Sequence, residues 1–96
     1  MPTARTSDET IQDVPGVRFR TDARPNTPQE AQLQGIQGEL ADGVTSLPSG
    51  TTLPHLNYYD AQTVNGPSQT YISLWVPGDQ RSQATRLLES AGFTVS

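Results

Sequence analysis

Apolar and polar residues alternate along two stretches of the chain, residues 14–21 (VPGVRFRT) and residues 70–76 (TYISLWV). This period of two is typical of a β-strand with one buried face. The positions on the apolar side are Val17, Phe19, Ile72, Leu74 and Val76. We therefore predict a strand at each place. We also predict a third strand over residues 56–64, before an Asn-Gly turn, and a short last strand over residues 93–95.

Two other stretches place apolar residues three or four positions apart, which is the spacing of an amphipathic helix. The first helix is expected to begin after Thr27, with Glu30 completing a capping box. The second is expected to begin with Asp79 as its cap and to end at Gly92. The apolar positions are Leu33, Ile36, Leu40, Val44 and Leu47 in the first stretch and Ala84, Leu87, Leu88 and Ala91 in the second. Val44 and Leu47 can belong to the helix or to the connector that follows it.

The resulting order is strand, helix, strand, strand, helix, strand, which indicates an α+β fold of the ferredoxin-like, split βαβ type. We expect a four-stranded antiparallel sheet with both helices on one face and the first and third strands at its centre. Residues 14–96 would form this single domain. Residues 1–13 are polar and show no periodicity, so we predict an N-terminal arm that is either loose or ordered against a partner.

The polar side of the two central strands then faces away from the helices. Only the arm or the loop near residue 50 could cover it, so we expect it to be exposed. The residues on that side are Arg18, Arg20, Tyr71, Ser73 and Trp75. Trp, Tyr and Arg are the residues that anchor protein interfaces, which favours an interaction surface. The alternative is that these aromatic residues serve only cross-strand packing on an open sheet.

Composition limits the partners, metal sites and catalytic groups that this chain can have. The net charge is −4, all six basic residues are Arg, and there is no Cys. Nucleic acid is therefore an unfavoured partner, and disulfides, thiolate metal sites and thiol catalysis are excluded. His55 is the only histidine, and no serine elbow or Gly-rich phosphate motif is present. We expect no enzyme, no metal and no cofactor.

Short segments resemble known families. Residues 84–95, ATRLLESAGFTV, resemble the helix-to-strand half of PASTA repeats, and residues 71–84 resemble the second half of SPOR domains. Each resemblance covers under a third of the chain, and the rest of either pattern is missing. Neither carries a function to this chain.

These patterns favour a non-enzymatic protein-interaction module that docks through its open sheet face and its arm. We expect a small subunit of a larger assembly, with a viral structural or accessory protein as one concrete form, and a protein partner or a second copy. With no leader or apolar span in the sequence, we expect a cytoplasmic or virion-borne protein without a membrane partner. One alternative is a single-stranded nucleic-acid binder that uses the Arg and aromatic residues of this face. Another is a ligand-sensing domain of ACT-like architecture.

Overall fold

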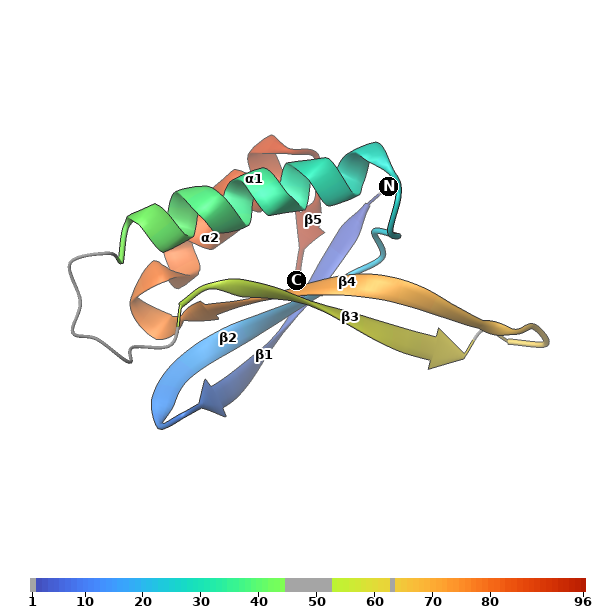
Figure 1. Ribbon diagram of the computed structural model, residues 1–96, viewed down its shortest axis with the longest axis horizontal. Helices are drawn as coiled ribbons and strands as arrows, with labels where there is room; N and C mark the ends of the chain where they lie inside the picture. The colour runs from blue at the N-terminus through green and yellow to red at the C-terminus, as the bar shows by residue number, and fades with distance from the viewer. Residues whose placement is uncertain (1, 45–52, 63) are drawn as a thin grey trace.

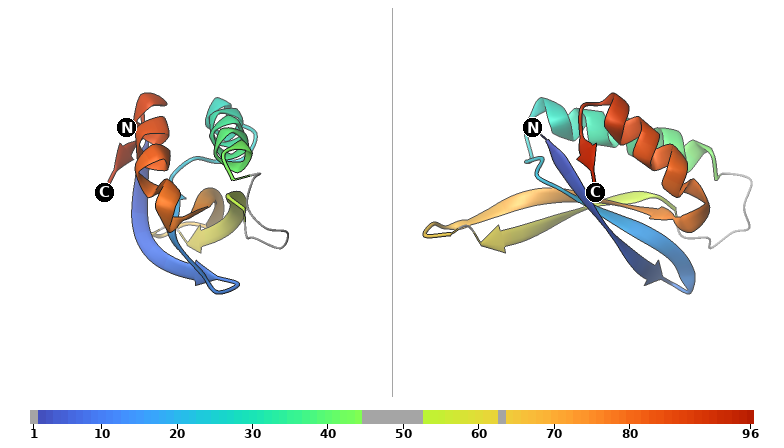
Figure 2. Two further views of the ribbon diagram at one scale, coloured as in Figure 1. Left: turned by 90° about the vertical axis from the view of Figure 1, so that its left-hand side faces the viewer. Right: turned by 180° about the vertical axis from the view of Figure 1, so that it is seen from behind.

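The computed structural model describes residues 2–44, 53–62 and 64–96. Within these ranges the strands form one sheet in the order β3-β4-β2-β1-β5, and both helices lie on one face of it (Figures 1 and 2). All neighbouring strands are antiparallel except β1 and β5, which are parallel. The elements are β1 (Thr3–Ile11), β2 (Val14–Thr21), α1 (Pro28–Asp42), β3 (His55–Gln62), β4 (Ser68–Pro77), α2 (Arg81–Ser90) and β5 (Thr94–Val95), with a 3-10 turn at Gly78–Gln80.

The predicted four-stranded, antiparallel ferredoxin-like sheet is wrong, because the observed sheet has five strands and is mixed. The expected pairing of β2 with β4 inside the sheet is present. The segment predicted as an N-terminal arm forms β1, which is inserted between β2 and β5. In the predicted sheet the last strand would pair antiparallel with β2. Because β1 runs antiparallel to β2 and occupies that place, β5 pairs with β1 in parallel instead. The amide of Thr6 donates to the carbonyl of Ser96 (2.9 Å), and the amide of Ser96 donates to the carbonyl of Ala4 (2.9 Å).

The hairpin between β1 and β2 explains why the sequence did not reveal β1. Its two turn residues, Gln12 and Asp13, both have positive φ (50° and 65°). Such two-residue turns usually carry Asn-Gly or Asp-Gly, and neither pair stands here. β1 also lacks an apolar face, since only Ala4 of its nine residues is buried. The strand is therefore held by its hydrogen bonds to β2 and β5 and not by a hydrophobic stripe.

The hydrophobic core lies between the helices and the sheet, and here the predicted pattern is confirmed. Every residue expected on the apolar side of the central strands is buried, as are Ala84 and Leu88 of the second predicted helix stripe, whereas Leu87 and Ala91 are only partly buried. Burial of a large apolar side chain stabilises by about 1.5–3 kcal/mol, so this layer holds the helices on the sheet. The core comprises Ala4, Val17, Phe19, Ala23, Leu33, Ile36, Leu40, Ile72, Leu74, Val76, Ala84, Leu88 and Phe93. Leu47, predicted for the stripe of α1, lies outside the described residues.

The start of α1 differs in detail from the predicted capping box. Thr27 occupies the cap position, but its hydroxyl donates to the carbonyl of Arg24 (2.6 Å). The carboxylate of Glu30 accepts from the amide of Asn26 (3.1 Å). The polar side chains therefore close the turn before the helix and do not bond reciprocally across its first turn.

The ends of α2 show one wrong and one confirmed prediction. Asp79 lies in the 3-10 turn, and the helix begins two residues later, at Arg81. Gly92 has a φ of 95°, and the amide of Phe93 donates back to the carbonyl of Leu88 (3.0 Å). This is the expected glycine termination, with Phe93 packed in the core behind it.

Candidate functional site

The sheet face that neither helix covers, called the open face below, carries all five residues predicted for it. Strand register places Arg18 opposite Trp75 and Arg20 opposite Ser73. Side chains alternate along each strand, so their neighbours on β1 and β3 point to the same side. These neighbours are Arg5, Ser7 and Glu9 on β1 and His55, Asn57 and Tyr59 on β3.

Trp75 was expected to be exposed on this face, and that expectation is wrong. Its side chain is 0% exposed. The indole nitrogen donates to the backbone carbonyl of Glu9 (2.8 Å), and the ring of His55 stacks on the indole at a centroid distance of 5.5 Å. Gly16 lies directly against the indole, where a Cβ would approach to 2.3 Å. The far end of the β1–β2 hairpin therefore helps to cover the tryptophan that the sequence pattern left uncovered.

Arg18 and Ser73 are also buried, again contrary to expectation, because they form a polar network with β1 and β3. The side chain of Arg18 is 8% exposed and forms an ion pair with Glu9, whose carboxylate also accepts from Nε at 3.0 Å. Nη1 donates to the hydroxyl of Ser73 (3.1 Å). The side-chain amide of Asn57 is oriented so that its oxygen and its nitrogen both have partners, and in this orientation the oxygen accepts from the same Nη1 (2.9 Å). One guanidinium thus links four strands, which is the pairing that a buried charge requires.

The remaining part of the open face is exposed and has a different character. Arg5 lies directly opposite Arg20 across the β1–β2 pair, and both side chains are exposed. Within residues 2–44, 53–62 and 64–96, no carboxylate lies within ion-pair distance of either one. Tyr59 and Tyr71, half-buried, stand beside them on β3 and β4. We call these four residues the arginine–tyrosine end.

The two tyrosines are held in place by their own contacts. Their rings lie 6.0 Å apart at an interplanar angle of 41°. The hydroxyl of Tyr59 donates to the carbonyl of Thr21 (2.9 Å), and that of Tyr71 donates to the side chain of Gln69 (3.1 Å). Burial raises the pKa of Tyr59, although Arg20 opposes the shift. The Tyr59 phenol is therefore neutral near pH 7.

These residues line two hollows that share Arg20 and Tyr59. One, of about 370 Å³, lies over the Arg18 network, and the other, of about 240 Å³, lies over the arginine–tyrosine end. The open face is therefore a continuous shallow surface with buried, fixed polar groups at one end and two exposed arginines at the other, where Arg20 donates only a long hydrogen bond to the hydroxyl of Ser7 (3.4 Å) and Asp22 also lines the hollow. Such a surface can bind an anionic group by charge and hydrogen bonding.

Two of the four residues of the arginine–tyrosine end, Arg5 and Tyr59, were not predicted from the sequence. Arg5 was assigned to an arm, and no local signal placed it in a strand. Tyr59 could have been found, because alternation in residues 55–59 sets it on the same side as His55 and Asn57. Without the sheet order, however, nothing showed that β3 lies beside β4 with Tyr59 opposite Tyr71.

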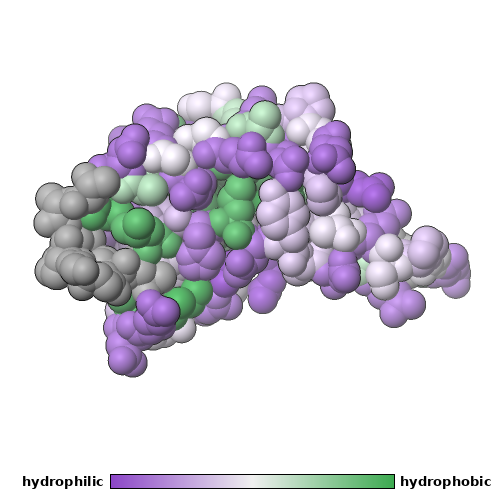
Figure 3. All heavy atoms as spheres, in the orientation of Figure 1, coloured by the Kyte–Doolittle hydropathy of each residue, from purple (hydrophilic) through white to green (hydrophobic). Residues whose placement is uncertain are grey.

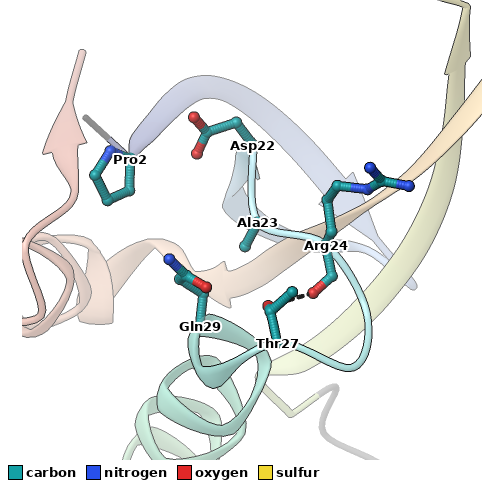
Figure 4. A pocket seen from close by; sticks show the side chains of 6 residues that line it. All are labelled: Pro2, Asp22, Ala23, Arg24, Thr27 and Gln29. Carbon is teal, nitrogen blue, oxygen red and sulfur yellow. Dashed lines mark hydrogen bonds between the residues drawn. The ribbon is translucent and has the colours of Figure 1, made fainter.

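A further hollow, of about 380 Å³, lies where the N-terminus meets the connector between β2 and α1 (Figure 4). Its polar side chains are largely used within the chain: the carboxylate of Asp22 accepts from the amide of Thr3 (2.9 Å), and the hydroxyl of Thr27 donates to the carbonyl of Arg24. The guanidinium of Arg24 points away from the other labelled side chains. We assign no function to this hollow.

In the described part of the chain, the first candidate side chain for catalysis or metal binding is that of the only histidine, His55. The ring of His55 is occupied by its stacking on Trp75, and its Nδ1 lies 2.9 Å from the carbonyl of Leu53. No group of three or more His, Cys, Asp or Glu side chains that could hold a metal ion occurs among these residues. Neither described helix is long and apolar enough to cross a membrane.

No protein-family model, curated protein or solved structure matches this chain. The geometry of the open face is therefore the basis for proposing a function.

Proposed function

We propose that the protein is a non-enzymatic interaction module that binds an acidic segment of a partner protein at its arginine–tyrosine end. The observation that carries the proposal is the cross-strand pair of Arg5 and Arg20, exposed and without a carboxylate partner among the described residues. Like charges placed directly opposite each other weaken a strand pair. A carboxylate of a partner placed between them would offset this repulsion and accept hydrogen bonds from either guanidinium, and an acidic segment with two carboxylates would neutralise both charges.

The neighbouring tyrosines support a protein partner. Tyr and Arg are enriched among the residues that contribute most to protein binding. The rings of Tyr59 and Tyr71 are already fixed by hydrogen bonds, so little side-chain entropy would be lost on binding. The buried network around Arg18 gives the surface a rigid base. A small subunit docking within a larger assembly is the concrete form of this proposal.

Single-stranded nucleic acid is the second candidate, because Arg and Tyr on a sheet face also suit phosphates and bases. One observation weighs against it: Trp75, the best stacking residue of the chain, is buried beneath β1 and β2. The net charge of −4 gives no long-range attraction to any polyanion, whether nucleic acid or acidic peptide, so it does not separate the two candidates. The ACT-like alternative depended on the four-stranded sheet that the chain does not form.

A titration with defined probes tests the proposal without knowledge of the natural partner. A glutamate-rich peptide added to the isotope-labelled protein at low salt should shift the NMR signals of Arg5, Arg20, Tyr59 and Tyr71. The double variant Arg5→Gln/Arg20→Gln should bind at least about tenfold more weakly, which is the loss of about 1.4 kcal/mol. Added salt should also weaken binding.

Arg86→Gln is the matched control, because Arg86 is an exposed arginine on α2, away from the open face. It should bind the peptide as the unaltered protein does. Absence of binding, or equal binding by the double variant, would contradict the proposal. Binding of a single-stranded oligo-dT in place of the peptide, lost in the double variant, would favour the nucleic-acid candidate.

A further inference from the structure

β3 forms one edge of the sheet, and in the described part of the chain only β4 pairs with it. The strand runs for eight residues along the front of the molecule, below α1, and continues with β4 into a hairpin that projects from the body (Figure 1). An edge strand exposes a row of backbone N–H and C=O groups to which another strand can bond.

The hydrogen bonds of β4 show which groups of β3 point outward. Ile72 lies opposite Tyr58, but its amide donates to the carbonyl of Ala23 (3.0 Å) and its carbonyl accepts from the hydroxyl of Thr21 (2.6 Å). Both groups of Ile72 therefore point toward β2 and away from β3. In an antiparallel ladder this makes Tyr58 and Ile72 a non-hydrogen-bonded pair, so the N–H and C=O of Tyr58 point to the free edge. Alternation gives Leu56 and Asp60 the same direction. The carbonyl of Leu56 also accepts from the side-chain amide of Asn57 (3.1 Å) in the orientation described above, and its second lone pair stays available to a partner strand.

β3 lacks most of the features that usually protect an edge, although α1 contacts it through the bond from Tyr58 to Glu30. It contains no Pro and no Lys, and its register with β4 is continuous through eight residue pairs, without a bulge. Its single carboxylate is Asp60. Tyr58 within the strand and Leu53 before it are exposed large side chains, 48% and 43% exposed. Figure 3 shows further apolar residues between α1 and the start of β3.

We propose that β3 pairs with β3 of a second copy of this chain, antiparallel about a two-fold axis at Tyr58. In this register Tyr58 faces the partner's Tyr58 and Leu56 faces the partner's Asp60. The outward N–H and C=O groups of residues 56, 58 and 60 then all meet outward groups of the partner. The only charge of the strand faces an apolar residue, so no like charges meet, and the two tyrosines form a favourable cross-strand pair. This complementarity of the strand to itself is the reason for assigning a second copy as its partner.

The pairing would place the two α1 helices on the same side of the joined sheet. α1 carries Glu30, Glu39 and Asp42 and no basic residue. Mutual repulsion should therefore oppose the dimer at low salt, and added salt should strengthen association. This salt dependence is opposite to that expected for acidic peptide at the arginine–tyrosine end, so the two proposals can fail independently.

Sedimentation velocity of the full chain from micromolar to millimolar concentration tests the pairing. We expect a reversible monomer–dimer equilibrium that Tyr58→Pro weakens at least tenfold, because proline removes an outward N–H that no described group of the chain uses. Tyr58→Phe keeps the amide and the ring and should therefore retain the dimerisation that Tyr58→Pro loses. Arg86→Gln, on α2 and away from β3, is the control that should leave the equilibrium unchanged.

Hydrogen exchange provides a second readout that does not depend on how the proline variant folds. In the unaltered protein the amides of Leu56, Tyr58 and Asp60 should exchange more slowly as concentration rises, whereas that of Tyr59, which is bonded to β4, should not change. A monomer at all concentrations, an oligomer larger than a dimer, or exchange independent of concentration at these three amides would overturn the proposal.

Discussion

At the scale of single residues, the contact between Gly16 and Trp75 decides what the open face can present. A Cβ on Gly16 would lie 2.3 Å from Cζ2 of Trp75 and 2.4 Å from the carbonyl oxygen of Val76. The indole ring of Trp75 and the backbone at Val76 cannot both shift away without a cost in free energy. We expect Gly16→Ala to lower the free energy of unfolding by about 1–3 kcal/mol, as overpacking does. Urea denaturation followed by circular dichroism measures this directly.

Gly38→Ala is the control for this substitution. A Cβ at Gly38 would meet nothing within 4 Å, and the residue lies inside α1. Alanine there should raise stability by up to about 1 kcal/mol, because it favours the helix over the unfolded chain. If Gly16→Ala proved as stable as the unaltered protein, the close packing of Trp75 beneath β2 would be wrong.

The contact between Tyr58 and Glu30 predicts a pair of coupled titrations. The hydroxyl of Tyr58 donates to the carboxylate of Glu30 (2.6 Å). This bond raises the pKa of Tyr58 and is the main reason that the pKa of Glu30 is lowered. The Glu30 contribution to stability is present above the ordinary glutamate pKa and is lost as pH falls through the lowered one. The Tyr58 contribution is present below the ordinary tyrosine pKa and is lost as pH rises through the raised one.

NMR titrations of two variants check this prediction. Tyr58→Phe should move the pKa of Glu30 up toward its ordinary value, and Glu30→Gln should move the pKa of Tyr58 down toward its own. If neither pKa changed, the hydrogen bond between β3 and α1 would not exist in solution.

At the scale of elements, the strands and helices with an apolar stripe could be predicted from the sequence, whereas β1 could not. β2 and β4 show themselves by alternation, and α2 by its spacing and by Gly92. β1 is polar on both faces, and its turn at Gln12 and Asp13 has no glycine or asparagine. Its evidence lies in hydrogen bonds to residues far away in the sequence, such as Ser96. Local patterns contain no information of that kind.

Two neighbouring carboxylates on β1 test whether this strand is part of the fold. Glu9 pairs with the buried Arg18, whereas Asp8 is almost fully exposed and lies 3.8 Å from the exposed Arg81. Glu9→Ala would leave a buried guanidinium without its carboxylate, and we expect a loss of about 1–3 kcal/mol in unfolding free energy. Asp8→Ala should change stability by less than about 0.5 kcal/mol, as exposed pairs contribute little. Equal effects of the two substitutions in thermal or chemical denaturation would mean that β1 is a loose arm.

At the scale of the whole molecule, β1 changes which part of the sheet is available to a partner. Alternation correctly predicts which side of the sheet Arg18, Ser73 and Trp75 occupy, but not that they are covered. Burial depends on how two long hairpins cross on a twisted sheet, which no residue pattern specifies. The exposed remainder is smaller than expected and consists of Arg5, Arg20 and two tyrosines. The proposed partner site is therefore a cationic, aromatic surface beside a buried tryptophan.

The fluorescence of Trp75 tests most directly whether β1 and β2 cover this side chain, because it is the only tryptophan in the chain. We predict that the monomer, confirmed by sedimentation at the concentration used, shows blue-shifted emission and strong protection from acrylamide quenching, both lost on denaturation. Emission at the wavelength of tryptophan in water, with free quenching in the folded monomer, would contradict the account. It would mean that β1 and β2 leave the tryptophan open, and that the exposed part of the sheet includes it.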